Sequence, residues 1–182
     1  QQMGATSPGA LDIAATTNGG VVSFQGSTAL SALTTAAGNY DIAFTGVSNS
    51  IGDAVVFNNS GRVQIGSSSF SSMLFDGGVN ALLGSVELAG DLFTSGDALA
   101  LGNVELLDAT VIDTTAAGAS PAGADLRLGG VAGSAVAGGL TLDSGTMGVL
   151  TVSGAVNDLP LLTLRNSNGA VFENEVGAVN PG

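Results

Sequence analysis

A short triplet of apolar, polar and apolar residues recurs along this chain. In Leu140-Thr-Leu142, Leu150-Thr-Val152 and Leu162-Thr-Leu164, two large aliphatic residues flank one threonine. An alternation with a period of two places the aliphatic side chains on one side of a β-strand and the threonine on the other. Glycine-containing turns separate the three copies. The pattern therefore predicts short, half-buried strands joined by tight turns.

The triplets are spaced regularly enough to indicate a structural repeat. One series begins at residues 22, 42, 63, 86, 104 and 126, so that its members follow one another at intervals near 21 residues. A second series, beginning at residues 55, 99 and 140, lies between them. Units of this size with two or more strands each cannot bury a core alone and become stable by stacking on one another.

The repeat predicts an all-β fold, a right-handed parallel β-helix of about eight coils. We expect a single array over residues 1–182, with residues 1–9 and 174–182 as linkers or frayed ends. Residues 110–123, which lack the triplet and contain Pro121, are expected to form a loop between units. An antiparallel sandwich also has strands every 8–12 residues. The β-helix is favoured because the repeat matches one coil and the inward residues are small aliphatics.

Charge is sparse and strongly acidic, which bears on the partners of the chain. There are 15 acidic residues, three arginines and no lysine or histidine, for a net charge of −12. Binding to nucleic acid or to an anionic membrane surface requires clustered basic side chains. No apolar run approaches the roughly 18 residues of a spanning helix. We therefore expect no nucleic-acid partner and no membrane insertion.

The acidic residues are candidate catalytic groups. Asp12, Asp41, Glu87 and Glu105 are the polar residues of strand triplets, and Glu87 and Glu105 are predicted to stack as a carboxylate pair on adjacent coils. Paired carboxylates perform acid/base hydrolysis of glycosides, but histidine and lysine are absent. We interpret these carboxylates as a solvated face. The prediction is that the chain is not an enzyme and has no catalytic residues.

Metal and cofactor sites are not predicted either. The absence of histidine and cysteine excludes zinc sites with nitrogen or sulfur ligands. Oxygen-rich turns suited to calcium occur at four places, but none matches a known calcium loop, and a turn-forming aspartate bonded to its own backbone is expected there. These turns are Gly52-Asp53, Asp76-Gly-Gly78, Gly90-Asp91 and Gly96-Asp97. An ice-binding ladder of Thr141, Thr151 and Thr163 is not expected, because other outward positions hold charged residues.

Two segments carry a family resemblance. Residues 139–156 and 39–46 resemble the repeats of filamentous-haemagglutinin-like and autotransporter-type passenger proteins, and the likeness extends over most of residues 11–176. Those proteins are large, secreted bacterial β-helices that act as adhesins, surface fibres and matrix components. The resemblance implies an extracellular or cell-surface location and assigns no functional residues.

The expected function is structural. We predict a β-helical segment of an extracellular fibre, matrix or adhesin, which associates head to tail with copies of itself or with adjoining repeats of a longer chain. Surface glycans are a further candidate partner. The alternatives are a carbohydrate-binding or carbohydrate-processing β-helix module and the shaft of a phage or viral fibre. Clustered exposed aromatic residues would favour the carbohydrate alternative, but Tyr40 is the sole tyrosine and most phenylalanines fall on inward positions.

Overall fold

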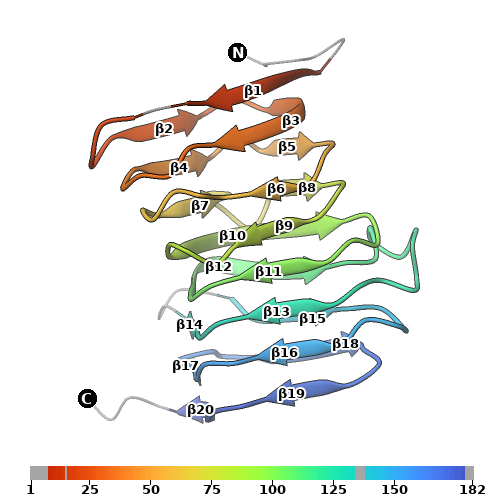
Figure 1. Ribbon diagram of the computed structural model, residues 1–182. Helices are drawn as coiled ribbons and strands as arrows, with labels where there is room; N and C mark the ends of the chain where they lie inside the picture. The colour runs from red at the N-terminus through yellow and green to blue at the C-terminus, as the bar shows by residue number, and fades with distance from the viewer. Residues whose placement is uncertain (1–7, 15, 134–137, 179–182) are drawn as a thin grey trace.

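The described part of the chain is a stack of β-strands. The computed structural model describes residues 8–14, 16–133 and 138–178. These residues contain no helix, and every pairing between their named strands is parallel. The strands wind into a solenoid of about seven turns (Figure 1). The predicted parallel β-helix is confirmed, and right-handed winding is the sense that crossovers between parallel strands take almost without exception.

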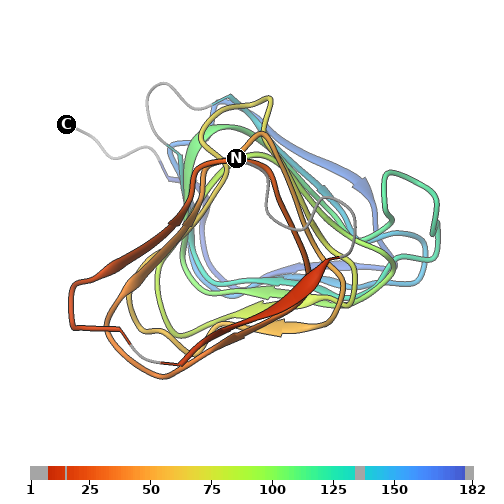
Figure 2. The same ribbon diagram turned by 90° about the horizontal axis from the view of Figure 1, so that it is seen from above.

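The strands lie on three faces that enclose a roughly triangular core (Figure 2). The first face contains β2 (Val21–Phe24), β4 (Asp41–Phe44), β7 (Val63–Ile65), the starts of β10 (Val86–Thr94) and β12 (Val104–Asp113), β14 (Val131–Gly133), β17 (Val156–Asn157) and β20 (Val176–Ala178). The second contains the start of β3 (Thr28–Thr35), β5 (Ser48–Ile51), β8 (Ser72–Phe75), the ends of β10 and β12, β15 (Leu140–Asp143) and β18 (Leu162–Asn166). The third contains β1 (Gly9–Ile13), the end of β3, β6 (Val55–Val56), β9 (Val79–Ala81), β11 (Leu99–Leu101), β13 (Leu126–Leu128), β16 (Leu150–Val152) and β19 (Ala170–Phe172).

The register stacks like residues on like. Val63, Val86 and Val104 are direct partners on the first face, and Leu140 pairs with Leu162 on the second. Parallel neighbours lie about 4.8 Å apart, so each inward side chain contacts the equivalent one on the next coil. Most inward columns therefore become rows of aliphatic carbon, which explains why a narrow core needs so few aromatic residues.

Several triplets lie on a different face from the one predicted. Leu126-Arg-Leu128 was expected to follow Val104 in the first series, but it pairs with β11 and β16 on the third face. The partner of Val104 is Val131. Leu140 likewise lies on the second face, although it was grouped with triplets of the third. Each coil carries three strands of the same alternation, so the pattern alone does not distinguish the faces.

The long loop was predicted with the wrong boundary. Thr110–Asp113 belong to β12, and the loop spans residues 114–125. It projects from one corner of the solenoid (Figure 2) and lengthens its coil without adding a strand. This is one reason why the chain completes about seven turns rather than eight. Gly9 and residues 176–178 form strands within the predicted end segments. Residues 1–7 and 179–182 of these segments lie outside the described residues.

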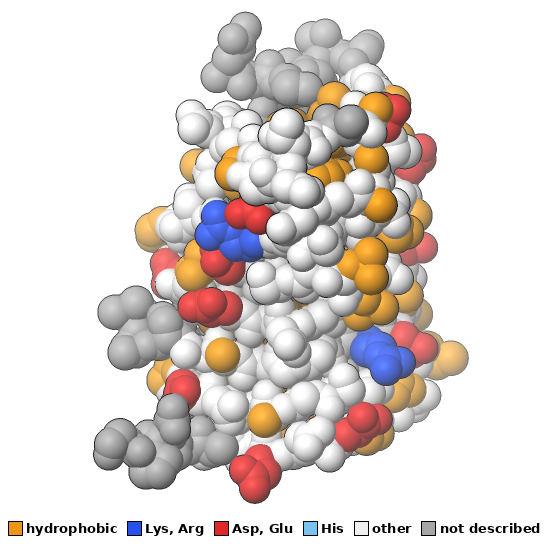
Figure 3. Space-filling view, turned by 60° about the vertical axis from the view of Figure 1, so that its left-hand side comes forward, with side chains coloured by type: hydrophobic (Ala, Val, Ile, Leu, Met, Phe, Trp, Pro, Cys, Tyr) orange, Lys and Arg blue, Asp and Glu red, His pale blue; other side chains and the backbone are white. Residues whose placement is uncertain are grey.

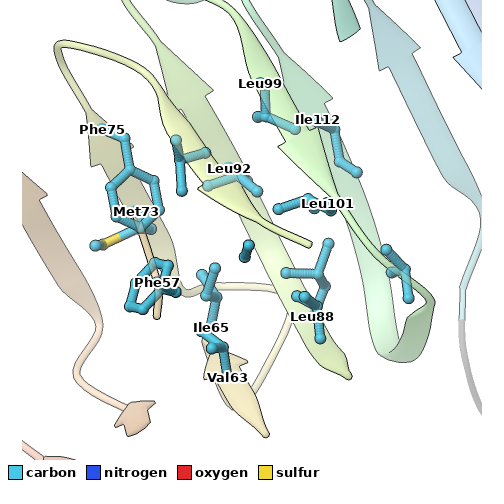
Figure 4. Packing of buried hydrophobic residues seen from close by; sticks show 14 of the residues in the cluster. Phe57, Val63, Ile65, Met73, Phe75, Leu88, Leu92, Leu99, Leu101 and Ile112 are labelled. Carbon is cyan, nitrogen blue, oxygen red and sulfur yellow. The ribbon is translucent and has the colours of Figure 1, made fainter. Parts of the chain in front are cut away.

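The interior is filled by buried aliphatic and aromatic side chains. Phe57, Met73, Phe75 and Leu88 converge from adjacent coils in the middle of the stack (Figure 4). Phe57 and Phe75 meet edge to face, with ring centroids 6.0 Å apart. Such aromatic pairs contribute about 0.5–1.5 kcal/mol beyond the burial of their area. The middle coils are thus held by side-chain packing as well as by main-chain ladders.

Candidate functional site

The two predicted carboxylates lie in register on adjacent coils, and an arginine binds one of them. Glu87 and Glu105 are register partners on the outside of the first face, as predicted. The guanidinium of Arg62 donates to both oxygens of Glu87 at 3.0 Å and lies 3.5 Å from Asp41. The hydrogen bond to Glu87 raises the pKa of Arg62 above its ordinary value. The cluster therefore balances charge between three neighbouring coils, which is a structural arrangement.

The four oxygen-rich turns do not gather into a metal site. Asp53, Asp76 and Asp97 lie at the same corner on successive coils and are exposed, while Asp91 is half-buried on the second face. In the part of the chain that the structure describes, no three acidic side chains are placed to hold a metal ion. None of the four carboxylates accepts a hydrogen bond from its own turn in that part, so their expected turn-forming role is wrong.

Two other aspartates take the turn-forming role. Asp113 and Asp143 are register partners where β12 and β15 end, and both are almost fully buried. Asp113 accepts hydrogen bonds from the main-chain N–H and the hydroxyl of Thr115, each at 2.5 Å. Asp143 accepts from the N–H of Gly145 and from the side-chain amide of Asn166, each at 3.0 Å. The sequence signal for this role is an aspartate at the end of a strand, two residues before the N–H group that it accepts from.

Two shallow clefts flank the loop 114–125 on the outside of the second face. One, of about 320 Å³, is lined by Asp113, Asp143, Thr146, Arg165 and Asn166 among others. The other, of about 330 Å³, is lined by Ser48, Ser50, Ser72, Leu74, Phe93 and their neighbours. The carboxylates of the first cleft already accept hydrogen bonds, and the second offers one aromatic ring. In the first cleft the hydroxyl of Thr115 donates to the carboxylate of Asp113, and this hydrogen bond belongs to the turn at the end of β12.

The threonines do not form a ladder of three. Thr141 and Thr163 are partners on the second face, whereas Thr151 lies on the third face between Arg127 and Val171. The outward surface at these positions is therefore chemically mixed. Figure 3 shows a face of the molecule on which acidic side chains are scattered and the few basic ones lie beside them. No ordered array of hydroxyl groups results.

The C-terminal coil is the feature that stands out. Its strands β18, β19 and β20 each have a neighbour on one side alone among the described residues. In the column Ile112, Leu142, Leu164 the exposed fraction of the side chain is 0%, 2% and 44%. Val176 is 50% exposed although Val156 directly above it is 2% exposed. The aliphatic rows of the core thus continue to this end, where no described residue covers them.

Among the described residues, main-chain groups at this end also lack hydrogen-bond partners. The carbonyl of Leu161 accepts from Leu140 on the coil above. Main-chain N–H and C=O groups of successive residues in a strand point to opposite sides of the strand. The main-chain groups of Thr163 therefore point to β15, like those of Leu161. The main-chain groups of Leu162 and Leu164 point to the open side. An apolar surface fringed by unpaired strand donors and acceptors is a template for a further strand. The C-terminal coil is therefore the candidate binding surface.

The N-terminal end differs from the C-terminal end. Strands β1 and β2 also have one neighbour each among the described residues. Yet their inward residues Ile13 and Phe24 are 7% and 8% exposed. The carbonyl of Ile13 accepts a hydrogen bond from the N–H of Ala36 on the coil below. The main-chain N–H and C=O of the preceding residue, Asp12, therefore point to the open side. The two ends thus present similar main-chain edges with different amounts of exposed carbon.

No family model, curated protein or solved structure matches the chain. Among the described residues, the structure contains no helix of the length and apolarity needed to cross a membrane. The fold and the exposed surfaces are therefore the physical basis for a functional proposal.

Proposed function

We propose that this chain is a structural segment of an extracellular fibre, matrix or adhesin, and that its coils continue end to end into a neighbouring coil. The observation that carries the proposal is the C-terminal coil, where Leu164 and Val176 are about half exposed, whereas their register partners on the coil above, Leu142 and Val156, are each 2% exposed. The continuing coil belongs either to a second copy of the chain or to adjoining repeats of a longer one.

Stacking of this kind covers the apolar side chains of the exposed end and also pairs its main-chain groups. Each added strand buries aliphatic carbon and pairs the free N–H and C=O groups of Leu162 and Leu164. Head-to-tail contacts do not close on themselves, so they give an open filament. The net charge of −12 opposes sideways association of the shafts. The resemblance to filamentous-haemagglutinin-like and autotransporter-type passengers supports the same proposal, including the extracellular location.

The test is the assembly state of the purified chain over a wide range of concentration. Sedimentation velocity and negative-stain electron microscopy should show filaments that lengthen with concentration. Leu164→Pro removes an open-side donor and should shorten them, because proline cannot donate to a ladder. Asp12→Pro should do the same at the other end.

Thr163→Pro is the matched control for the fold. It removes a donor that faces β15, so it should lower the melting temperature as well as the assembly. A chain that stays monomeric at high concentration, with its last coil protected from hydrogen exchange, would overturn the end-to-end proposal.

A further inference from the structure

Three places in the chain have the side chain required for succinimide formation followed by glycine. They are Asn18-Gly19, Asp76-Gly77 and Asn168-Gly169. In this reaction the main-chain nitrogen of the glycine attacks the side-chain carbonyl carbon of the preceding residue. Asparagine is thermolabile in proteins for this reason. Whether a given site reacts depends on whether that nitrogen is free and whether the backbone has room to close the ring.

The three sites differ in these two requirements. The N–H of Gly19 donates to the carbonyl of Asn39 at 2.7 Å, which holds the nitrogen away from the side chain. A Cβ built on Gly77 would lie 2.4 Å from the main-chain nitrogen of Ala54, so that corner is packed against the coil above. Each of these two sites therefore lacks one requirement.

Asn168-Gly169 meets both requirements. The pair lies at the exposed corner between β18 and β19 in the last full coil (Figure 1). The N–H of Gly169 donates to no residue in the described part of the chain. A Cβ built on Gly169 would meet no atom within 4 Å. The corner is held to the coil above by Asn168 N–H to Gly148 and by Leu150 N–H to the carbonyl of Gly169.

We infer that Asn168 is a site of spontaneous deamidation and isoaspartate formation in the folded protein. The nitrogen of Gly169 gives up its proton to water and bonds to Cγ of Asn168. The bond from Cγ to the side-chain nitrogen breaks, and that nitrogen takes up a proton from water and leaves as ammonia. Water then opens the imide at either carbonyl, which gives aspartate or isoaspartate. Water is the sole co-reactant, and no oxidation or reduction occurs.

The product changes the end coil in two ways. A neutral amide becomes a carboxylate at a terminus that already carries Glu173 and Glu175. In isoaspartate the main chain also gains a methylene before Gly169, which moves its carbonyl out of register with the N–H of Leu150. Weaker assembly of modified chains follows, and this consequence rests on the proposed function, whereas the modification itself does not.

The experiment follows all three sites in one sample. The intact chain is aged at mildly alkaline pH, digested and analysed by tandem mass spectrometry, with isoaspartyl methyltransferase labelling to identify isoaspartate. Asn168 should react first, and Asn18 roughly fivefold more slowly, the ratio that one net hydrogen bond represents. In the chain unfolded by urea, Asn18 and Asn168 should react at the same rate.

Two variants complete the test. Asn168→Gln should abolish the product at that corner and leave the slow reaction at Asn18 unchanged. Asn168→Asp introduces the charge without the methylene, so its assembly compared with that of the aged chain separates the two effects. The inference is overturned when the folded chain shows no product at Asn168, or when Asn18 reacts as fast as Asn168 in the folded state. An aged chain that is modified but assembles normally would count against the fibre proposal and leave the modification standing.

Discussion

Two leucines in one column of the core provide a test of the open end. Leu142 and Leu164 are register partners on the second face, and both point inward. Leu142 is 2% exposed and Leu164 is 44% exposed. Replacing each by alanine makes the same chemical change one coil apart, so any difference reports on what covers the last coil.

The expected magnitudes follow from burial. Leucine to alanine removes three carbon groups at about 0.8 kcal/mol each when they are fully buried. At Leu142 the cavity adds to this, for a loss of about 3 kcal/mol. At Leu164 just over half of the side chain is buried in the monomer, so the free energy of unfolding should fall by about 1.3 kcal/mol. For a chain of this length the melting temperature should drop by roughly 9 °C and 4 °C respectively.

The remainder of the Leu164 burial belongs to the contact with the next coil. It amounts to about 1 kcal/mol, or roughly fivefold weaker association. Thermal unfolding followed by circular dichroism measures the first quantity, and sedimentation velocity measures the second. Val171→Thr is the control, since Val171 lies on the same coil, is 49% exposed and points outward.

Two outcomes would refute this reasoning. Equal destabilisation by the two alanine variants in dilute solution would mean that Leu164 is covered in the isolated chain. Unchanged assembly of Leu164→Ala, with normal stability, would mean that the end makes no contact through its core side chains.

Three further predictions concern the corners and the acidic residues. A Cβ on Gly84 would lie 1.8 Å from the carbonyl oxygen of Gly61, so Gly84→Ala should destabilise by about 1–3 kcal/mol, whereas Gly9→Ala, which meets no atom within 4 Å, should not. Burial raises the pKa of Asp91 above its ordinary value of 3.8; the folded state thus disfavours its charge, and Asp91→Asn should stabilise at neutral pH by less than about 1 kcal/mol. The gain in the free energy of unfolding should disappear as the pH falls from above the raised pKa of the folded state to below the ordinary pKa of the unfolded state. Urea titrations at several pH values measure it. Chelator treatment should leave the melting temperature unchanged, and stabilisation by calcium would show that the exposed aspartates are ligands.

Much of the fold could be predicted from the sequence because it depends on the alternation of apolar and polar residues. In Val86-Glu-Leu88 and Val104-Glu-Leu106 the pattern alone indicates which side chains are buried, and the structure places the two triplets in register. A stacked coil repeats one local rule, so the period near 21 residues predicts a solenoid without knowledge of any long-range contact.

The face on which each triplet lies was settled by the tertiary structure. Leu126 and Val131 each begin a short apolar stretch, and the 12-residue loop before Leu126 shifts which of them meets Val104. Loop lengths are free to vary because a surface loop adds little closure entropy. Wherever a loop is lengthened, the spacing between triplets along the chain therefore no longer indicates which face each triplet lies on.

The amino-acid sequence by itself determined the strands that carry the apolar–polar–apolar triplet, the buried side of each of these strands, and the absence of histidine, lysine and cysteine chemistry. Only the tertiary structure decided that Arg62 binds Glu87, that Asp113 and Asp143 accept hydrogen bonds within turns, and that Leu164 lies at an exposed end. Alternation is a local property of a strand, whereas a partner on the next coil lies about twenty residues away, at a distance set by every turn between.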